Sequence, residues 1–141
     1  MEEINWWSIL LSSLTPFVIG YIYYHRLIFG KPWMNSIGMT EEKARQANIP
    51  LVFGLSFIMA FLISFYLINF NNGSGQEGEF DNFGHGAIHG AFLSIFFIIP
   101  VFVMNGLFEQ KSWKNMLLNA GYWLMTLSVM GGILDAMNHW P

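Results

Sequence analysis

Four long apolar stretches, separated by shorter polar segments, dominate the pattern of hydrophobic and polar positions along the chain. None of them contains Asp, Glu, Lys or Arg, and each is apolar on all faces rather than along one stripe. A hydrocarbon core about 30 Å thick needs roughly 20 apolar residues in a helix, and each stretch reaches that length. The pattern therefore predicts four membrane-spanning helices, at residues 4–25, 49–70, 86–108 and 115–134.

The three connections between these spans differ in composition. In the first, Thr40 precedes two glutamates, which is typical of a helix start because the hydroxyl caps free N–H groups and acids favour the positive end. We expect a short interfacial helix there, followed by Pro50 at the opening of the second span. The second connection, residues 71–79, is an acidic loop rich in Gly and Asn. The third, residues 109–114, is so short that the third and fourth spans must be antiparallel neighbours.

These elements define an all-α, single-domain, integral membrane four-helix bundle, and the composition agrees with this class. The chain is 54% hydrophobic and 11% charged, which is far from the average of soluble domains. Six basic residues and a net charge of −3 give no footprint for nucleic acid, so no nucleic-acid partner is expected. The absence of cysteine excludes disulfides, a thiolate nucleophile and cysteine-ligated zinc.

The basic residues indicate how the bundle is oriented in the membrane. All of them flank or lie within the first and third connections, whereas the N-terminus, the acidic loop and the C-terminus have none. By the positive-inside rule, the first and third connections are cytoplasmic and both termini are non-cytoplasmic. The residues concerned are Arg26, Lys31, Lys43, Arg45, Lys111 and Lys114.

A polar belt is expected at the outer ends of the third and fourth spans. His85 and His89 are four residues apart, as are Asp135 and His139, so each pair shares one face of its helix. Imidazoles and a carboxylate from adjacent helices could hold zinc or another divalent metal ion, or could accept protons. They could instead be interfacial side chains that reach water, while the glycine after each histidine serves close helix packing.

A second polar belt is expected at the cytoplasmic ends of the first, third and fourth spans. It forms either a pocket for a small polar ligand or lipid headgroup, or a set of polar contacts that fasten the helices together. Arg26 and Glu109 fall at similar depth, and we expect them to form an ion pair. The residues of this belt are Tyr24, His25, Arg26, Asn105, Glu109, Asn119 and Tyr122.

Between the two belts the spans carry hydroxyl side chains but no ionisable group. Ion-coupled transporters usually place a titratable group near the midplane, so this class is disfavoured. The chain also lacks a Gly-x-Ser-x-Gly elbow, a His-Glu-x-x-His motif and a phosphate loop. These absences favour a protein that is not an enzyme.

Four segments resemble the domain of unknown function 1761 family. They are Phe29–Met34, Gly38–Glu42, Asn105–Glu109 and Asn119–Trp123. The resemblance spans nearly the whole chain and implies a four-span bacterial protein, expected in the inner membrane, with no assigned activity. The histidine-containing stretch at residues 83–90 resembles some members more than the family at large, so the resemblance implies no role for it.

Three functional interpretations follow from the sequence. The first is a non-enzymatic scaffold or accessory subunit that lies in the lipid bilayer and assembles with itself or with another membrane protein. The second is a small oligomeric channel or facilitator. The third is a membrane protein that binds a divalent metal ion through the outer His and Asp residues. No cofactor is expected apart from that ion.

Overall fold

The computed structural model describes residues 4–70 and 81–137, and this part of the chain contains helices and no strands. Four helices are long and apolar enough to cross a membrane, one at each of the four predicted stretches. The third is longer at its start than expected, because Asn82 caps it. The spans are α1 (Trp6–Tyr23), α4 (Ile49–Leu67) with a 3₁₀ turn (Ile68–Phe70), α5 (Phe83–Leu93) with a π-helical turn (Ser94–Ile98) and α6 (Ile99–Phe108), and α7 (Trp113–Ala136).

Each span begins at a polar side chain that accepts a hydrogen bond from a backbone N–H of its first turn. The first N–H groups of a helix have no partner within the helix, so a cap from the chain itself fixes its start. The caps are Asn5, Asn48, Asn82 and Ser112.

The first connection contains more helix than the sequence predicts. The expected interfacial helix is α3 (Glu41–Arg45), whose cap is Thr40: its hydroxyl oxygen accepts from the backbone N–H of Lys43 at 3.1 Å. Before it, a π-helical turn (Arg26–Gly30) leads into α2 (Lys31–Ser36), which has a proline in its first turn. We expected no helix at α2, and its contacts with α7 hold it in place.

The third span changes its winding ahead of Pro100. Proline has no N–H to give to the preceding turn, and its ring crowds the carbonyl four residues earlier. The chain accommodates this with the π-helical turn Ser94–Ile98, which separates α5 from α6. Local changes of this kind are a common way for a helix to absorb a proline.

The buried core lies toward the ends of the spans that carry the termini. Six apolar side chains from α1, the end of α4 and the second half of α7 form it, namely Ile9, Leu67, Ile68, Leu127, Met130 and Leu134. Beside it, Ser64 donates to Ser12 at 3.1 Å, and Ser12 donates to the carbonyl oxygen of Met130 at 3.2 Å. These hydroxyls therefore link α1, α4 and α7 rather than lining an open path.

The predicted antiparallel pair of α5 and α7 is confirmed, and small residues bring its backbones close together. A Cβ atom added at Gly90 would run into the backbone carbonyl of Leu127. One added at Gly86 would run into the carbonyl of Gly131 and lie 2.5 Å from Cβ of Asp135. Only glycine permits this approach, as in other close helix pairs of membrane proteins.

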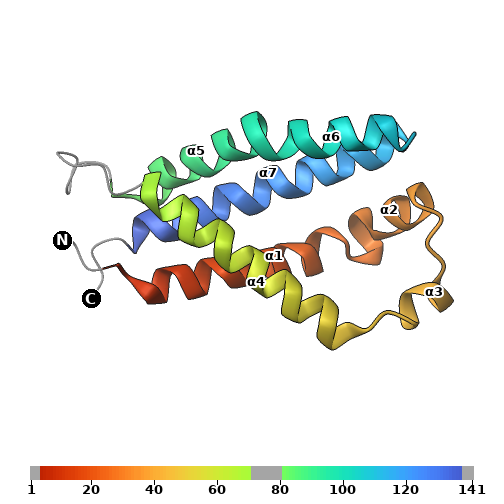
Figure 1. Cartoon of the computed structure of the whole chain (residues 1–141), viewed down its shortest axis with the longest axis horizontal. Coiled ribbons are helices and arrows are strands. Elements are labelled where there is room, and N and C mark those ends of the chain that lie inside the picture. The colour runs from red at the N-terminus through yellow and green to blue at the C-terminus, as the bar shows by residue number, and fades with distance from the viewer. Residues whose placement is uncertain (1–3, 71–80, 138–141) are drawn as a thin grey trace.

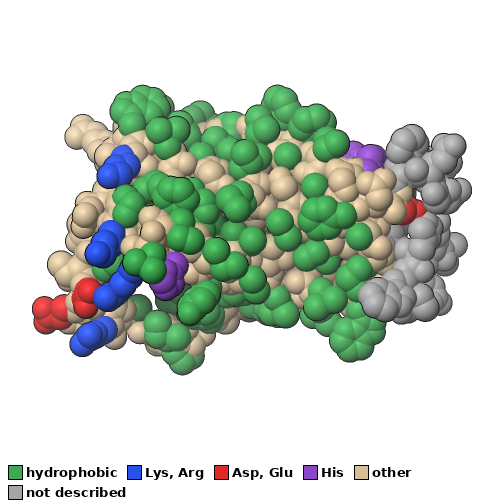
Figure 2. All heavy atoms as spheres, turned by 180° about the vertical axis from the view of Figure 1, so that it is seen from behind, with side chains coloured by type: hydrophobic (Ala, Val, Ile, Leu, Met, Phe, Trp, Pro, Cys, Tyr) green, Lys and Arg blue, Asp and Glu red, His purple; other side chains and the backbone are tan. Residues whose placement is uncertain are grey.

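The two ends of the bundle differ in charge. Figure 1 places the start of α1 and the end of α7 at one end and α2, α3 and the turn between α6 and α7 at the other. We call the second the basic end, because all six Lys and Arg residues belong to its segments. We call the first the histidine end, because the start of α5 brings His85 and His89 there. Apolar side chains cover the surface between the ends (Figure 2), as expected of a bundle in lipid.

Candidate functional site

The histidine end brings three predicted residues together across the α5–α7 contact. The Asn82 cap fixes the first turn of α5 by accepting from the backbone N–H of His85 at 3.0 Å. Helical spacing then puts His85 and His89 on one face of α5. Because the glycines let α7 approach this face, Asp135 on α7 reaches the first imidazole.

The three side chains form a linear hydrogen-bonded chain, which we call the histidine chain. Oδ2 of Asp135 lies 2.8 Å from Nδ1 of His85. Nε2 of His85 lies 3.1 Å from Nε2 of His89, with the two rings nearly perpendicular. Asp135 is fully buried, whereas a quarter of the His85 side chain is exposed. The chain therefore runs from a buried carboxyl group to a partly exposed imidazole.

Both ends of the histidine chain have an atom without a partner among the described residues. Oδ1 of Asp135 is buried and accepts no hydrogen bond within that part of the structure. Nδ1 of His89 makes no hydrogen bond to any residue in 4–70 or 81–137. Buried polar groups are normally satisfied, so the Asp135 oxygen, which is buried, points to a role beyond packing, whereas the His89 nitrogen is partly exposed.

The linear arrangement of Asp135, His85 and His89 is not one that surrounds a metal ion. Asp135 bonds to the inner nitrogen of His85, so the three groups line up instead of surrounding one point. Within the described residues no three His, Asp or Glu side chains are grouped as metal ligands. His139, the fourth predicted ligand, lies outside the described residues, as does Glu79, which the sequence places nearby.

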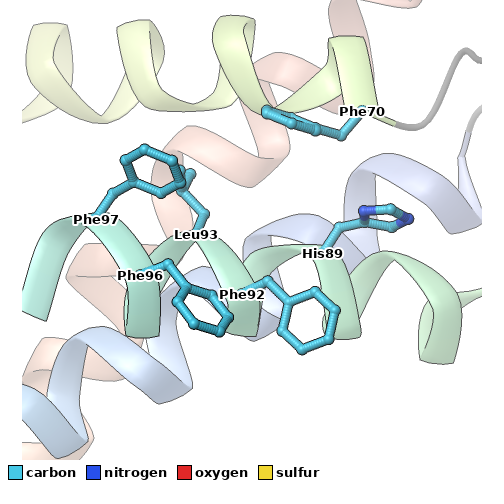
Figure 3. Close-up of a pocket in the computed structure, with 6 residues that line it drawn as sticks. All are labelled: Phe70, His89, Phe92, Leu93, Phe96 and Phe97. Carbon is cyan, nitrogen blue, oxygen red and sulfur yellow. The ribbon is translucent and has the colours of Figure 1, made fainter.

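An apolar groove of about 380 Å³ starts at His89. Figure 3 shows His89 at one end and Phe97 at the other; His89, Leu93 and Phe97 point toward the side of Phe70, whereas Phe92 and Phe96 point away from it in this view. The residues from α5 and its π-helical turn follow a helical spacing of three and four, so they share one face. The lining residues are Phe70, His89, Phe92, Leu93, Phe96 and Phe97.

At the basic end, polar side chains of α2 and α7 and the residue after α1 form a second hydrogen-bonded chain, which we call the amide chain. The Tyr24 hydroxyl donates to Oδ1 of Asn119 at 2.9 Å, and Nδ2 of Asn119 donates to Oδ1 of Asn115 at 3.2 Å. Nδ2 of Asn115 then donates to Oγ of Ser36 at 3.1 Å, which donates to the carbonyl oxygen of Trp33 at 2.7 Å. The chain thus closes on the backbone.

A polar pocket of about 310 Å³ lies beside the amide chain, between α6 and α7. Three residues of the predicted cytoplasmic belt line it, Asn105, Glu109 and Asn119. Asn105 and Glu109 are exposed, and Lys111 pairs with Glu109 at 2.5 Å across its rim. The structure thus gives this part of the belt a shallow pocket.

The other residues of this belt lie outside the pocket, and one predicted contact is wrong. Arg26 pairs with Glu41 of α3 at 2.6 Å and does not pair with Glu109. The interfacial helix brings a closer carboxylate to Arg26 than α6 does. His25 is exposed and caps the π-helical turn. The Tyr122 hydroxyl donates to the carbonyl oxygen of Pro16 at 2.8 Å, so Tyr122 fastens α7 to α1.

Tyr24 is the titratable group of the amide chain. Burial raises the pKa of its phenol above the ordinary value, and the neighbouring Tyr122 and Tyr23 raise this pKa further. Its ring lies 5.1 Å from the ring of Tyr122 and 5.1 Å from that of Trp33, centroid to centroid. The phenol therefore stays protonated and acts as a hydrogen-bond donor.

Two parts of these sites escaped the sequence reasoning. Asn115 is buried at the centre of the amide chain, and its spacing of four from Asn119 repeats the His85–His89 pattern, a signal that could have identified it. The phenylalanines of the groove gave no such signal. They belong to a largely apolar span, so no change between polar and apolar positions marks the face that they share.

The fold defines a class: an all-helical bundle of four helices long and apolar enough to cross a membrane, with polar groups gathered at its two ends. Within this class, the chain belongs to the family described as "Protein of unknown function (DUF1761)", whose model matches residues 7–135. The resemblance in the sequence is thereby confirmed over nearly the whole chain. Searches of curated proteins and of solved structures give no match.

Proposed function

We propose that this chain is a non-enzymatic integral membrane protein whose histidine end is a proton-accepting binding site. Asp135 and His85 hold or release a shared proton, and His89 connects them to the surface. The sequence left this role open beside metal binding and simple contact with water. The linear order of the three groups supports it.

The observation that carries the proposal is the buried carboxyl group of Asp135 with one hydrogen bond. A carboxylate in an apolar core needs a compensating charge or proton. His85 can supply either, by donating a hydrogen bond through Nδ1 or by carrying a full positive charge. Because His89 contacts the other nitrogen of His85, a proton gained at His89 is felt at Asp135.

The charges around the site favour uptake of a proton. Asp81, just before α5, acts on Asp135 as a second negative group. All six Lys and Arg residues belong to the basic end, so none of them neutralises the carboxyl groups. A proton on the two imidazoles is therefore the compensating charge available from the described residues.

Histidine NMR on the ¹⁵N-labelled full chain in detergent micelles tests this role. We expect the ring signals of His85 and His89 to change together with pH, as a coupled pair, and the change to shift in Asp135→Asn. His25, at the opposite end, is the internal control and should titrate identically in both proteins. Separate titrations of His85 and His89 that ignore Asp135→Asn would refute the proposal.

The membrane side of this site is also a proposal. The gathering of all basic residues at one end supports a cytoplasmic basic end and non-cytoplasmic termini, in a bacterial inner membrane. Cysteine labelling gives the test, because the native chain has no cysteine. A cysteine in place of Ser36 should react only after the membrane is made permeable, whereas one in place of Gly84 should react in intact spheroplasts.

The other interpretations of the sequence keep their own tests. A scaffold or accessory subunit should self-associate or retain a partner in mild detergent. A channel should pass solute in proteoliposomes and lose that flux in Asn105→Ala or Glu109→Ala. A metal site should retain about one ion per chain by elemental analysis and lose it in His89→Ala.

A further inference from the structure

The groove that begins at His89 joins an apolar surface to a hydrogen-bonding nitrogen. Nδ1 of His89 has no partner among the described residues, and His89 is the polar side chain in the groove lining. Depending on its tautomer, this nitrogen donates or accepts a hydrogen bond. A ligand in the groove can thus make a directed polar contact at this end.

The walls of the groove fit a flat ring. Four of its six lining residues are phenylalanines, from α5, its π-helical turn and the 3₁₀ turn after α4. Aromatic side chains stack on or meet the edge of another ring, whereas an alkyl chain gains only general apolar contact. Phe70 and His89 have ring centroids 6.4 Å apart and so pack on each other, which gives the groove an aromatic wall at the end that carries the imidazole.

The size and position of the groove fit a ligand that arrives from the membrane. Its volume of about 380 Å³ lies at the small end of ligand sites and accommodates one ring with the beginning of a tail. Phe92, Phe96 and Phe97 are 54%, 66% and 63% exposed, so the groove opens sideways on the surface that faces lipid. Figure 3 shows it running along α5 away from His89.

The lack of Lys and Arg at the histidine end favours a ligand whose polar group is neutral. A phosphate or carboxylate would require a permanent cation, and all Lys and Arg residues belong to the basic end, whereas a proton on the imidazoles is shared with the buried Asp135. A neutral carbonyl or hydroxyl oxygen needs only the single hydrogen bond that His89 offers. These conditions favour a neutral ring that carries oxygen over phospholipids and fatty acids.

We infer that the groove binds the ring of a membrane-soluble quinone or its quinol, with one ring oxygen on Nδ1 of His89 and the tail toward lipid. A quinone carbonyl accepts from the protonated nitrogen, and a quinol hydroxyl donates to the unprotonated one. The inference shares His89 with the proposed proton-accepting site and would give that site its ligand.

Equilibrium binding of ubiquinone-1 to the full chain in phosphatidylcholine nanodiscs tests the inference. We expect ubiquinone-1 to bind at least tenfold tighter than 1-decanol or decanoic acid. His89→Phe should weaken ubiquinone-1 binding about fivefold to tenfold, the equivalent of one hydrogen bond. The matched control His25→Phe, at the basic end, should bind as the parent does.

A second pair of variants covers the case in which His89→Phe fails to fold. Phe96→Ala removes one exposed wall of the groove and should weaken binding at least threefold. Phe108→Ala removes an 89% exposed ring at the end of α6 and should leave binding unchanged. Equal affinity in both Phe variants, or ubiquinone-1 binding no tighter than 1-decanol, would overturn the inference.

The NMR experiment on the histidines separates this inference from the proposed function. If ubiquinone-1 fails to bind while His85 and His89 still titrate as a pair, the quinone assignment is wrong and the proton-accepting site stands. If ubiquinone-1 binds in a His89-dependent manner while the histidines titrate separately, the quinone assignment stands and the proton role is wrong.

Discussion

The amide chain at the basic end and the histidine chain at the other end are both lines of polar side chains joined by hydrogen bonds. The amide chain starts at the Tyr24 hydroxyl and finishes on the backbone carbonyl of Trp33, with each donor matched to an acceptor. The histidine chain starts at a buried carboxyl group and stops at His89, with an unpartnered atom at each end among the described residues. The first is complete in itself, and the second has room for a proton and a ligand.

This difference separates a structural role from a functional one. Amides do not titrate, and burial keeps the one titratable member of the amide chain protonated by raising the pKa of Tyr24. The amide chain therefore has one protonation state and one arrangement. Imidazole groups exchange protons in the physiological range, and one imidazole of the histidine chain is hydrogen-bonded to the buried carboxyl group of Asp135. We therefore expect substitutions in the amide chain to change stability alone, and substitutions in the histidine chain to change stability and its response to pH.

The largest effect should come from the glycine contact beneath the histidine chain. In Gly90→Ala the added Cβ would meet the carbonyl of Leu127, which cannot move without shifting α7. We expect a loss of about 3 kcal/mol or more in the free energy of unfolding, together with separation of Asp135 from His85. Thermal unfolding in detergent, followed by tryptophan fluorescence, measures it. Gly54→Ala is the matched control, because a Cβ there meets nothing within 4 Å, and it should be neutral or stabilising.

The next effect should come from removing the carboxyl group. Asp135→Ala leaves His85 without its buried partner and should lower the free energy of unfolding by roughly 2–3 kcal/mol. Asp135→Asn keeps the shape and a hydrogen bond, so it should lose less stability while removing the charge. Unfolding curves at several pH values between 5 and 8 give the loss of stability in each of the two variants. Equal losses in both variants would mean that shape and the hydrogen bond contribute nothing.

A smaller effect should follow from cutting the amide chain. Asn119→Ala removes two hydrogen bonds and should lower the free energy of unfolding by about 1–2 kcal/mol. The loss should be the same at pH 5 and pH 8, because no group of the amide chain titrates there. Asn105→Ala is the control, since its exposed side chain makes no hydrogen bond within the described residues. A loss that varies with pH would place the amide chain among the titrating sites.

The smallest effect concerns Tyr24 in alkaline solution. The pKa of Tyr24 is raised in the folded protein, so the stabilising contribution of its neutral phenol is complete below the unfolded value of about 10. This contribution is lost as the pH rises above that value toward the folded pKa. We expect stability to fall between pH 10 and 12 in the parent, and to fall less in Tyr24→Phe. If stability fell equally with pH in the parent and in Tyr24→Phe, the phenol of Tyr24 would contribute nothing to the alkaline loss of stability.

The sequence predicted the helices and the proximity of the three residues of the histidine chain. It did not predict which residues the exposed charged side chains pair with. Apolar length alone identifies the spans, and a spacing of four on neighbouring antiparallel helices brings His85, His89 and Asp135 together. The Arg26–Glu109 pair failed for a different reason. Long exposed side chains take whichever partner a connection offers, and the position of α3 beside Arg26 depends on tertiary contacts.

The groove could not be predicted for a related reason. In a soluble helix, polar residues mark the face that meets solvent, and the remaining face is the buried one. In α5 nearly every position is apolar, whether it faces lipid, α7 or the groove. A site made of phenylalanine in such a helix has no signature in the pattern, and only the structure shows that Phe70 lines the same groove as the phenylalanines of the third span.

The close contact between α5 and α7 has a consequence for biosynthesis. Asp135, His85 and His89 all belong to the second hairpin, and the glycines that join them are within that hairpin. The first hairpin leaves the ribosome earlier and contributes Phe70 to the groove, but no member of the histidine chain. Each hairpin can therefore enter the bilayer as a unit, with the polar line already assembled inside the second. In a bilayer the ionisable groups would then enter already hydrogen-bonded to one another, and the groove forms only when the two hairpins dock.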